Sequence, residues 1–289
     1  MSVYKQLTKF GIVVFAMTSA IAGYALSFES YEAFNFVEPM LLLIGLYFLC
    51  SGSFAINQAQ EWKIDLRMER TKSRPIPAGK VSPLQAWLFG LVFVTFGAVT
   101  LLILNPFTAY LGLATVIMYN LLYTLFFKRQ LAFGAVPGAV PGAMPVVIGY
   151  SVNSPEIFRA ECVYVFLVMF LWQMPHFWTL AIRYREDYKK GGFPVLPVNI
   201  GVHRTLFHIG LYTFVYVGLA LASPWFLKTH ILYLMFVLPL AIKIVFEFLK
   251  YYQSDSEKSW LPFFLWTNLS MLIFLGAPVF DKWIYISLS

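Results

Sequence analysis

The sequence predicts an all-α fold: a polytopic membrane protein of nine transmembrane helices that form a single domain over residues 1–289. Three observations carry this prediction. The chain is 60% hydrophobic and only 12% charged, whereas about 25% of the residues of a soluble domain are charged. Its apolar runs approach the ~20 residues that cross a bilayer as a helix. Its basic residues gather on one side of the predicted topology.

Nine apolar runs follow one another along the chain, each close to the length that crosses ~30 Å of hydrocarbon. They lie at residues 10–28, 37–56, 84–104, 107–127, 131–151, 161–182, 206–224, 229–250 and 260–279. The first run lacks the short apolar core and small-residue cleavage site of a signal peptide. We therefore expect it to be a retained span.

The basic residues indicate the orientation of these spans. With the N-terminus inside, 18 of the 21 basic residues lie on the inner side, and the outer side keeps only Arg159, Lys228 and Lys282. Lysine and arginine concentrate in cytoplasmic loops, so we expect a cytoplasmic N-terminus, an outer C-terminus and residence in the cell (inner) membrane. The net charge of +7 then reflects topology, and no nucleic-acid partner is expected.

The long polar connections, residues 57–83 and 183–205, both fall on the inner side, where we expect the functional site. Cys50 and Cys162 lie inside apolar runs. Two such cysteines supply neither a disulfide framework nor a metal cluster, so we expect them to pack as small hydrophobic residues.

The first polar connection begins with oxygen-bearing side chains spaced by four: Asn57, Glu61 and Asp65. At 3.6 residues per turn these positions form one stripe on a helix. Mg²⁺ prefers a few carboxylates, with waters and substrate phosphates completing its coordination. The stripe therefore predicts a metal site. An amphipathic loop that merely stays wet is the alternative.

Basic side chains follow directly after the stripe, at Arg67, Arg70, Lys72 and Arg74. Guanidinium groups fork onto diphosphate oxygens, and lysine adds a point charge. Acidic and basic residues at this spacing predict a site for a metal-chelated diphosphate.

The sixth run contains Trp172 and His176 around a proline, Pro175. If the helix continues past Pro175, Trp172, His176, Arg183 and Asp187 share one face. A proline break within a span is tolerated where a polar cavity satisfies the freed carbonyl. His176 is then an ordinary hydrogen-bonded histidine, an axial iron ligand or a donor that polarises a substrate. Asp187 either holds a second Mg²⁺ or forms a solvated pair with a lysine.

Aromatic residues are abundant, with 29 Phe, 17 Tyr and 8 Trp. Most are expected to pack helices or to lie at the membrane interfaces. A few near the polar connections could shield an allylic carbocation with their π faces. The candidates for this role are Tyr119, Tyr123, Trp172 and Phe177.

Several motifs together resemble those of a known family. They are residues 57–83, Tyr123-Thr-Leu-Phe-Phe-Lys128-Arg129, residues 138–149, Trp172-Gln-Met-Pro-His-Phe-Trp and Asp187-Tyr-Lys-Lys-Gly-Gly-Phe-Pro-Val-Leu-Pro-Val. These stretches resemble the UbiA-type intramembrane prenyltransferases, and within that superfamily the heme O synthase (protoheme IX farnesyltransferase) family. The Trp-Gln-x-Pro-His-Phe-Trp element is the specific one, because quinone-pathway relatives usually lack it.

The resemblance implies a nine-helix bundle and the Mg²⁺-dependent transfer of a farnesyl group from farnesyl diphosphate to the vinyl group of heme B, with water added to give heme O. Heme B would be a substrate rather than a permanent cofactor. The product would pass to a downstream heme-modifying enzyme or to the assembly of a heme–copper oxidase.

The resemblance also implies roles for individual residues. Asn57, Glu61, Asp65 and Asp187 would be the catalytic and metal-binding residues. Diphosphate would be bound by Arg67, Arg70, Lys72, Arg74, Lys128 and Arg129, of which the last two could instead meet heme propionates. Heme would be bound by His176, Trp172, Arg183 and Arg185.

Two positions depart from the family pattern. Many relatives in the wider superfamily carry an acid four residues before the position of Asp187, where this chain has Arg183. The number of metal ions is therefore open, and Arg183 with Arg185 could receive propionates instead. The stretch after Arg129 lacks the polar start that is usual there, which leaves the role of that turn open.

Two rival functions stay open at this point. One is a prenyltransferase that acts on a quinone precursor or another aromatic acceptor. The other is a membrane transporter or heme carrier, which should carry ionisable residues near the bilayer midplane and repeated broken helices.

Overall fold

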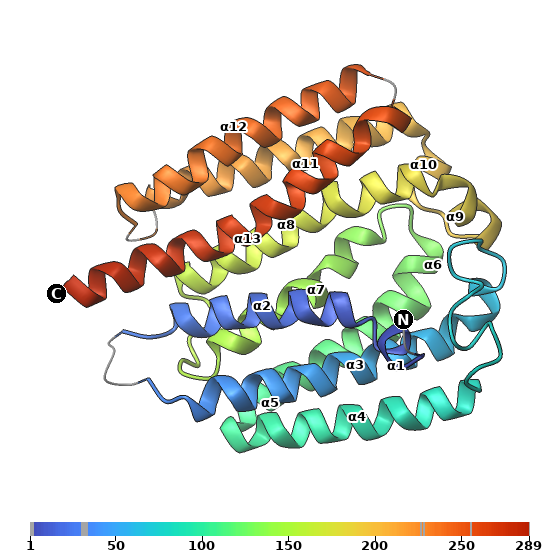
Figure 1. The fold of residues 1–289 in the computed structure, drawn as a ribbon, viewed down its shortest axis with the longest axis horizontal. Helices are drawn as coiled ribbons and strands as arrows, with labels where there is room; N and C mark the ends of the chain where they lie inside the picture. The colour runs from blue at the N-terminus through green and yellow to red at the C-terminus, as the bar shows by residue number, and fades with distance from the viewer. Residues whose placement is uncertain (1–2, 30–33, 226, 228, 255, 289) are drawn as a thin grey trace.

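The computed structural model describes residues 3–29, 34–225, 227, 229–254 and 256–288, and within them every regular element is a helix (Figure 1). One of the three outer basic residues, Lys228, lies outside the described residues. The all-α class predicted from the sequence is confirmed.

Each of the nine predicted apolar runs corresponds to a helix. These helices are α2 (Phe10–Leu26), α3 (Val37–Asp65), α4 (Pro83–Leu104), α5 (Pro106–Ile117), α7 (Ala135–Tyr150), α8 (Ala160–Arg183), α11 (Val202–Ala222), α12 (Ile231–Gln253) and α13 (Ser256–Leu288). α5 continues through a π-helical stretch, η2 (Met118–Phe127), into α6 (Lys128–Gln130). The short elements are α1 (Val3–Leu7), α9 (Arg185–Gly191), α10 (Leu196–Asn199) and η3 (Ser223–Trp225).

Seven of the described helices are long and apolar enough to cross a membrane, and this protein is an integral membrane protein. The other two predicted spans, α2 and α7, are shorter apolar helices. The positions of all nine apolar helices therefore match the prediction, whereas only seven reach full spanning length, α5 together with η2 and α6 being one of them.

Local sequence signals set several helix boundaries. α4 begins at a capping box, in which Ser82 and Gln85 satisfy each other's backbone amides and Pro83 occupies the first turn. The Asn105 side chain caps α5 in the same way, by accepting from the amide of Thr108. The Asn105-Pro106 sequence thus makes a tight connection between α4 and α5.

The helices pack as a bundle in which α3 lies against α4, α2 against α7, α7 against α8, and α12 against α13 (Figure 1). α2 and α7 approach so closely that a Cβ atom at Gly23 or Gly149 would run into a backbone oxygen of the facing helix. Small residues at a membrane helix interface permit such close packing. The contact holds two of the cavity walls described below.

The two long polar connections lie at the same end of the bundle, where α9 and α10 stand beside the segment that follows α3 (Figure 1). The chain ends on the other side, since the C-terminus lies at the end of the bundle away from α9 and α10. The topology predicted from the sequence requires the two polar connections to lie on one side of the membrane and the C-terminus to lie on the other.

Candidate active site

The acidic stripe of α3 is buried at the polar end of the bundle. α3 continues as a helix through Asp65, as the spacing predicts. Asn57, Glu61 and Asp65 are buried, with only 1%, 2% and 1% of their surfaces exposed. Buried carboxylates must be compensated by charged or hydrogen-bonding partners.

Each member of the stripe meets a cation from a different part of the chain. The ammonium of Lys9 donates to Asn57 Oδ1 at 2.8 Å. Lys128 donates to both oxygens of Glu61, at 2.7 and 2.8 Å. The buried carboxylate of Asp65 accepts from Arg74 Nη1 at 2.9 and 2.8 Å. These three residues and their three cations together form a charged array, in which neither carboxylate is free.

Asp187 connects the second polar segment to the first. Its carboxylate accepts from the backbone amides of Glu69 at 3.3 Å and Arg70 at 3.0 Å. The guanidinium of Arg70 in turn lies over the ring of Tyr188, 4.5 Å from its centroid. The segments are separated by more than a hundred residues in the chain, yet they form one surface.

A small apolar cluster beneath these contacts holds the two segments together. Met68 from the first segment packs with Tyr188 and Phe193 from the second, and all three are buried. A Cβ at Gly191 would come within 2.9 Å of the sulfur of Met68. Glycine at this position therefore permits the close approach.

The second segment corrects one prediction. α8 runs unbroken through Pro175 to Arg183, but the helix ends at Tyr184, whose φ is −107° and ψ 30°. Asp187 belongs to a separate helix, α9. Trp172, His176 and Arg183 therefore lie on one helix, whereas Asp187 does not share their face, because the chain turns before reaching it.

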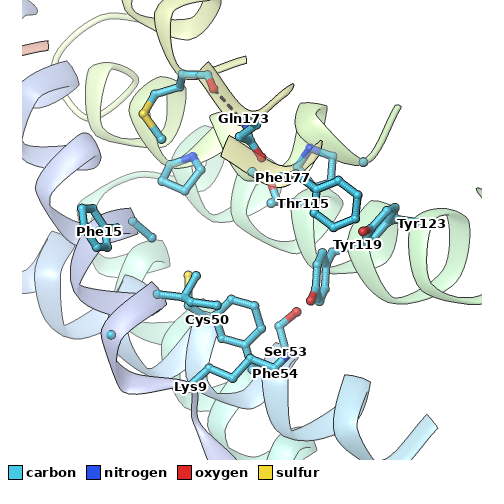
Figure 2. Close-up of a pocket in the computed structure, with 18 of the residues that line it drawn as sticks. Lys9, Phe15, Cys50, Ser53, Phe54, Thr115, Tyr119, Tyr123, Gln173 and Phe177 are labelled. Carbon is cyan, nitrogen blue, oxygen red and sulfur yellow. Dashed lines mark hydrogen bonds between the residues drawn. The ribbon is translucent and has the colours of Figure 1, made fainter. Parts of the chain in front are cut away.

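A cavity of about 880 Å³ lies beside the charged array, because Lys9 and Arg74 belong to its lining. Figure 2 shows part of this lining. This volume lies near the upper end of the ~300–1,000 Å³ typical of ligand sites. The polar side chains that line it include Lys9, Arg70 and Arg74. Its apolar lining comes mainly from α2, α3, α5, α7 and α8, with Phe15, Cys50 and Phe177 among the residues drawn.

All four aromatic residues singled out from the sequence line this cavity: Tyr119, Tyr123, Trp172 and Phe177. The two tyrosines lie on the π-helical stretch, with their ring centroids 5.7 Å apart. The stretch is joined to α3, because Asn57 Nδ2 donates to Thr124 Oγ1 at 3.1 Å. π-Helical turns occur frequently at functional sites.

His176 lies in the cavity wall, and its ring packs against two aromatic rings. The ring centroids of Trp172 and Phe264 are 4.6 and 4.9 Å away. His176 Nδ1 makes a 2.8 Å hydrogen bond with Asn268 Oδ1. The histidine is thus hydrogen-bonded within the bundle and also lines the cavity, and its roles as an iron ligand or as a donor to a substrate stay predictions.

The remaining predicted site residues do not line the cavity in the described part of the chain. Lys128 is paired with Glu61 instead, and Arg129 donates to the carbonyl of Gln60 at 3.3 Å. Arg67 is exposed, and the exposed Lys72 pairs with Glu69. Two further basic residues stand outside as well, namely Arg183, stacked on Trp260, and Arg185.

Sequence reasoning treated Lys9 only as a flanking charge and missed it as a site residue. Lys9 has a left-handed backbone, with φ 50° and ψ 48°, directly before α2. Such conformations are uncommon for residues other than glycine and concentrate at functional sites. Burial, followed by the nearby charges of Arg74 and Lys128, lowers the pKa of Lys9 to about 7. No local motif in the sequence marks this residue.

No group of three or more His, Cys, Asp or Glu side chains that could hold a metal ion occurs among the described residues. The acids are instead separated along α3 and individually paired with cations. A metal at this site would therefore depend on a second source of ligands, such as the oxygens of a phosphate group.

Comparison with known proteins decides the family. Residues 16–269 match the model of the UbiA prenyltransferase family. The chain belongs to the UbiA prenyltransferase family. A protoheme IX farnesyltransferase from Bdellovibrio bacteriovorus is 50% identical to it over 281 residues, which cover 97% of this chain and 96% of that protein.

Two solved structures share the UbiA fold. Digeranylgeranylglyceryl phosphate synthase superposes with a TM-score of 0.77 at 20% identity, covering 97% of each chain. A UbiA homolog from Archaeoglobus fulgidus, bound to GPP and Mg²⁺, superposes with a TM-score of 0.69 at 19% identity, covering 96% of this chain and 99% of that one. The UbiA-type helical fold implied by the resemblance is confirmed, whereas its count of nine spanning helices is not.

Proposed function

We propose that the chain transfers the farnesyl group of farnesyl diphosphate to the vinyl group of heme B, with addition of water, to give heme O. One observation carries the proposal: a single cavity joins a charged mouth, an apolar interior and a wall that holds His176. The relative from Bdellovibrio bacteriovorus, a protoheme IX farnesyltransferase, supports this choice of substrates.

The mouth of the cavity suits a diphosphate group. Lys9, Arg70 and Arg74 line it, and charge-assisted hydrogen bonds to phosphate are among the stronger ones in proteins. Arg74 Nη1 already donates to both oxygens of the Asp65 carboxylate, and the same guanidinium group can donate to the oxygens of a phosphate. We infer that these cations turn from their present partners toward the diphosphate when it binds.

The donor chemistry of the site fits Mg²⁺. Asn57, Glu61, Asp65 and Asp187 offer only oxygen atoms, which this hard cation prefers. Mg²⁺ commonly takes one or two carboxylates and completes its coordination with waters and substrate phosphates. One or two separate carboxylates beside a phosphate site are therefore sufficient to bind Mg²⁺. The metal, when bound, would help to neutralise charge on the leaving diphosphate.

The side chains of the protein act by electrostatics and by exclusion of water. Arg70 and Arg74 stabilise the charge that develops as the bond between the allylic carbon and the diphosphate oxygen breaks. Aromatic faces of Tyr119, Tyr123 and Phe177 stabilise the farnesyl cation. The vinyl carbon of the acceptor then forms the new carbon–carbon bond, and water adds to the resulting cation with loss of a proton.

On the acceptor side, His176 stands where a planar substrate in the cavity would meet it. We infer that it contacts the heme iron and that Trp172 packs beside it. Contacts between the propionates and Arg183 or Arg185 remain a prediction, because these arginines lie outside the cavity lining.

We also propose that the protein resides in the inner membrane with its charged site facing the cytoplasm. The concentration of 18 of the 21 basic residues on the side of the polar connections supports this orientation. Product would then pass to a heme-modifying enzyme or to heme–copper oxidase assembly.

The test is an assay of the purified full-length protein with farnesyl diphosphate, Mg²⁺ and either heme B or 4-hydroxybenzoate, followed by mass spectrometry. We expect heme O from the first mixture and no prenylated product from the second. Prenylated 4-hydroxybenzoate would favour the quinone-pathway rival. Absence of metal-dependent diphosphate release with both acceptors would favour a transporter or carrier.

A further inference from the structure

The hydrogen bonds around His176 form a chain with a defined direction. Asn268 Nδ2 donates to the backbone carbonyl of Phe264 at 2.7 Å. That carbonyl can only accept, so the amide nitrogen must face it. The amide oxygen of Asn268 therefore faces His176 Nδ1, 2.8 Å away.

The direction of this chain determines which ring nitrogen carries the proton. An amide oxygen can only accept a hydrogen bond, so His176 Nδ1 must donate. A neutral imidazole has one N–H and one lone pair. With the proton on Nδ1, the lone pair lies on Nε2, which makes no hydrogen bond within the described residues while the ring lines the cavity.

The surroundings hold the ring in this orientation. Trp172 and Phe264 both pack against it, with interplanar angles of 36° and 31°. The indole of Trp172 is itself fixed, because its Nε1 donates to the backbone carbonyl of Thr267 at 3.0 Å. α13 therefore holds His176 both directly, through Asn268, and indirectly, through Trp172.

We propose that Asn268 is a positioning residue that keeps His176 in the Nδ1-protonated tautomer, so that Nε2 serves as an electron-pair donor toward the cavity. The group that receives this pair is the iron of the porphyrin substrate, and this part rests on the proposed function. Outer partners of ligating histidines commonly fix the tautomer and raise the basicity of the ligating nitrogen.

A neutral amide suits this task. It accepts from Nδ1–H as a carboxylate would, but it places no negative charge within the bundle. Asparagine also has no titratable proton, so the acceptor that faces Nδ1–H stays the same as pH changes. An aspartate in its place would draw the proton more strongly and give the ring more imidazolate character.

The first test uses the ligand-free protein. The chain has four histidines, so ¹⁵N-histidine labelling of the full-length protein in detergent gives a simple spectrum, and the His176→Gln variant identifies the His176 signals. We expect a protonated Nδ1 and an unprotonated Nε2 in the wild type. Asn268→Leu should give a mixture of tautomers. A protonated Nε2 in the wild type, or an unchanged spectrum in Asn268→Leu, would overturn the proposal.

The second test titrates ferrous heme B into the same proteins. We expect Asn268→Leu to weaken heme binding about 10- to 100-fold, the range typical of losing such an outer partner. Asn268→Asp should retain binding and raise the iron–histidine stretching frequency. The control is Leu269→Val, since Leu269 lies next to Asn268 on α13 but is an exposed apolar residue outside the cavity lining. It should leave both readouts unchanged.

The two tests separate the failure of this inference from the failure of the proposed function. One outcome is that heme binds through His176 with the same affinity and the same iron–histidine stretching frequency in the wild type, Asn268→Leu and Asn268→Asp. That result would overturn the role of Asn268 alone. A wild type with the expected tautomer that binds no heme overturns the proposed acceptor and with it the iron contact, whereas the tautomer assignment stands.

Discussion

At the scale of single residues, the site is built from ion pairs that a substrate can exchange. The carboxylate of Asp65 is almost fully buried, and Arg74 donates two hydrogen bonds to it. An ion pair buried for structure alone is a weak source of stability, because desolvation offsets most of the attraction. A pair at the edge of a cavity that suits a diphosphate is better explained as part of the binding machinery.

We predict that Asp65→Ala or Arg74→Ala abolishes heme O formation, with a fall of at least about 100-fold, the order of losing one preorganised electrostatic group. The measurement is the initial rate of heme O production by mass spectrometry, with membrane insertion checked by detergent extraction as a folded monodisperse species. Arg67→Ala is the matched control, since Arg67 is an exposed arginine of the same segment. Normal heme O production by either variant would remove that residue from the site.

A second residue-scale prediction concerns Lys9. Asparagine tolerates the left-handed backbone of this position, so Lys9→Asn removes the ammonium with little change of conformation. We expect the KM for farnesyl diphosphate to rise about 10- to 100-fold, from the ~1.5–3 kcal/mol of a hydrogen bond to a charged group. Lys9→Arg should restore most of the affinity.

The control for Lys9 is Lys63→Asn, which removes an exposed lysine located near a tryptophan ring. Steady-state kinetics with varied farnesyl diphosphate at saturating heme B measure all three variants. An unchanged KM in Lys9→Asn would show that Lys9 serves only to hold Asn57.

At the scale of elements, two short devices shape the site. The π-helical stretch Met118–Phe127 directs Tyr119 and Tyr123 into the cavity, and α9 carries Asp187 to the amides of the first polar segment. α9 ends at Gly192, which has a φ of +74°. A left-handed conformation costs an L-residue with a side chain about 1–2 kcal/mol, so the turn depends on glycine.

We therefore predict that Gly192→Ala lowers the thermal stability of the protein in detergent, through a loss of about 1–2 kcal/mol in this turn, and raises the KM for farnesyl diphosphate. Gly218→Ala is the control, because Gly218 lies within α11 and a Cβ there would meet nothing within 4 Å. It should be neutral or slightly stabilising, since alanine is the better helix former. Equal melting temperatures for the two variants would contradict this account of the turn.

At the scale of the whole molecule, the arrangement of the helices sets which groups share an aqueous compartment. The polar connections lie at one end of the bundle, and the C-terminus lies at the other (Figure 1). The charged mouth of the cavity therefore faces one side of the membrane. A soluble diphosphate product would be released on that side.

We predict that a reporter that is fluorescent only in the cytoplasm is bright when fused to the N-terminus and dark when fused to the C-terminus. The expectation follows from the excess of basic residues at the end that carries the site. A periplasmic phosphatase reporter should give the opposite pattern. Equal signals from both ends would contradict the odd number of spans.

Much of the element scale could be predicted from the sequence. All nine apolar runs are helices, the Asn57–Asp65 spacing is helical, and four aromatic residues chosen for their position line the cavity. These features depend on residues that are neighbours in the chain, through hydropathy and helical periodicity. The error at Asp187 has the same origin, because periodicity carried past Arg183 cannot register a turn at Tyr184.

The sequence alone thus determined the membrane class, the helices, the charged end and the family resemblance. Only the tertiary structure decided that Lys128 pairs with Glu61 across 67 residues and that Asn268 binds His176 across 92. It also revealed Lys9, which no motif marks. The physical reason is that such pairs form when packing brings distant segments within hydrogen-bond distance, whereas hydropathy and spacing record only what each segment requires for itself.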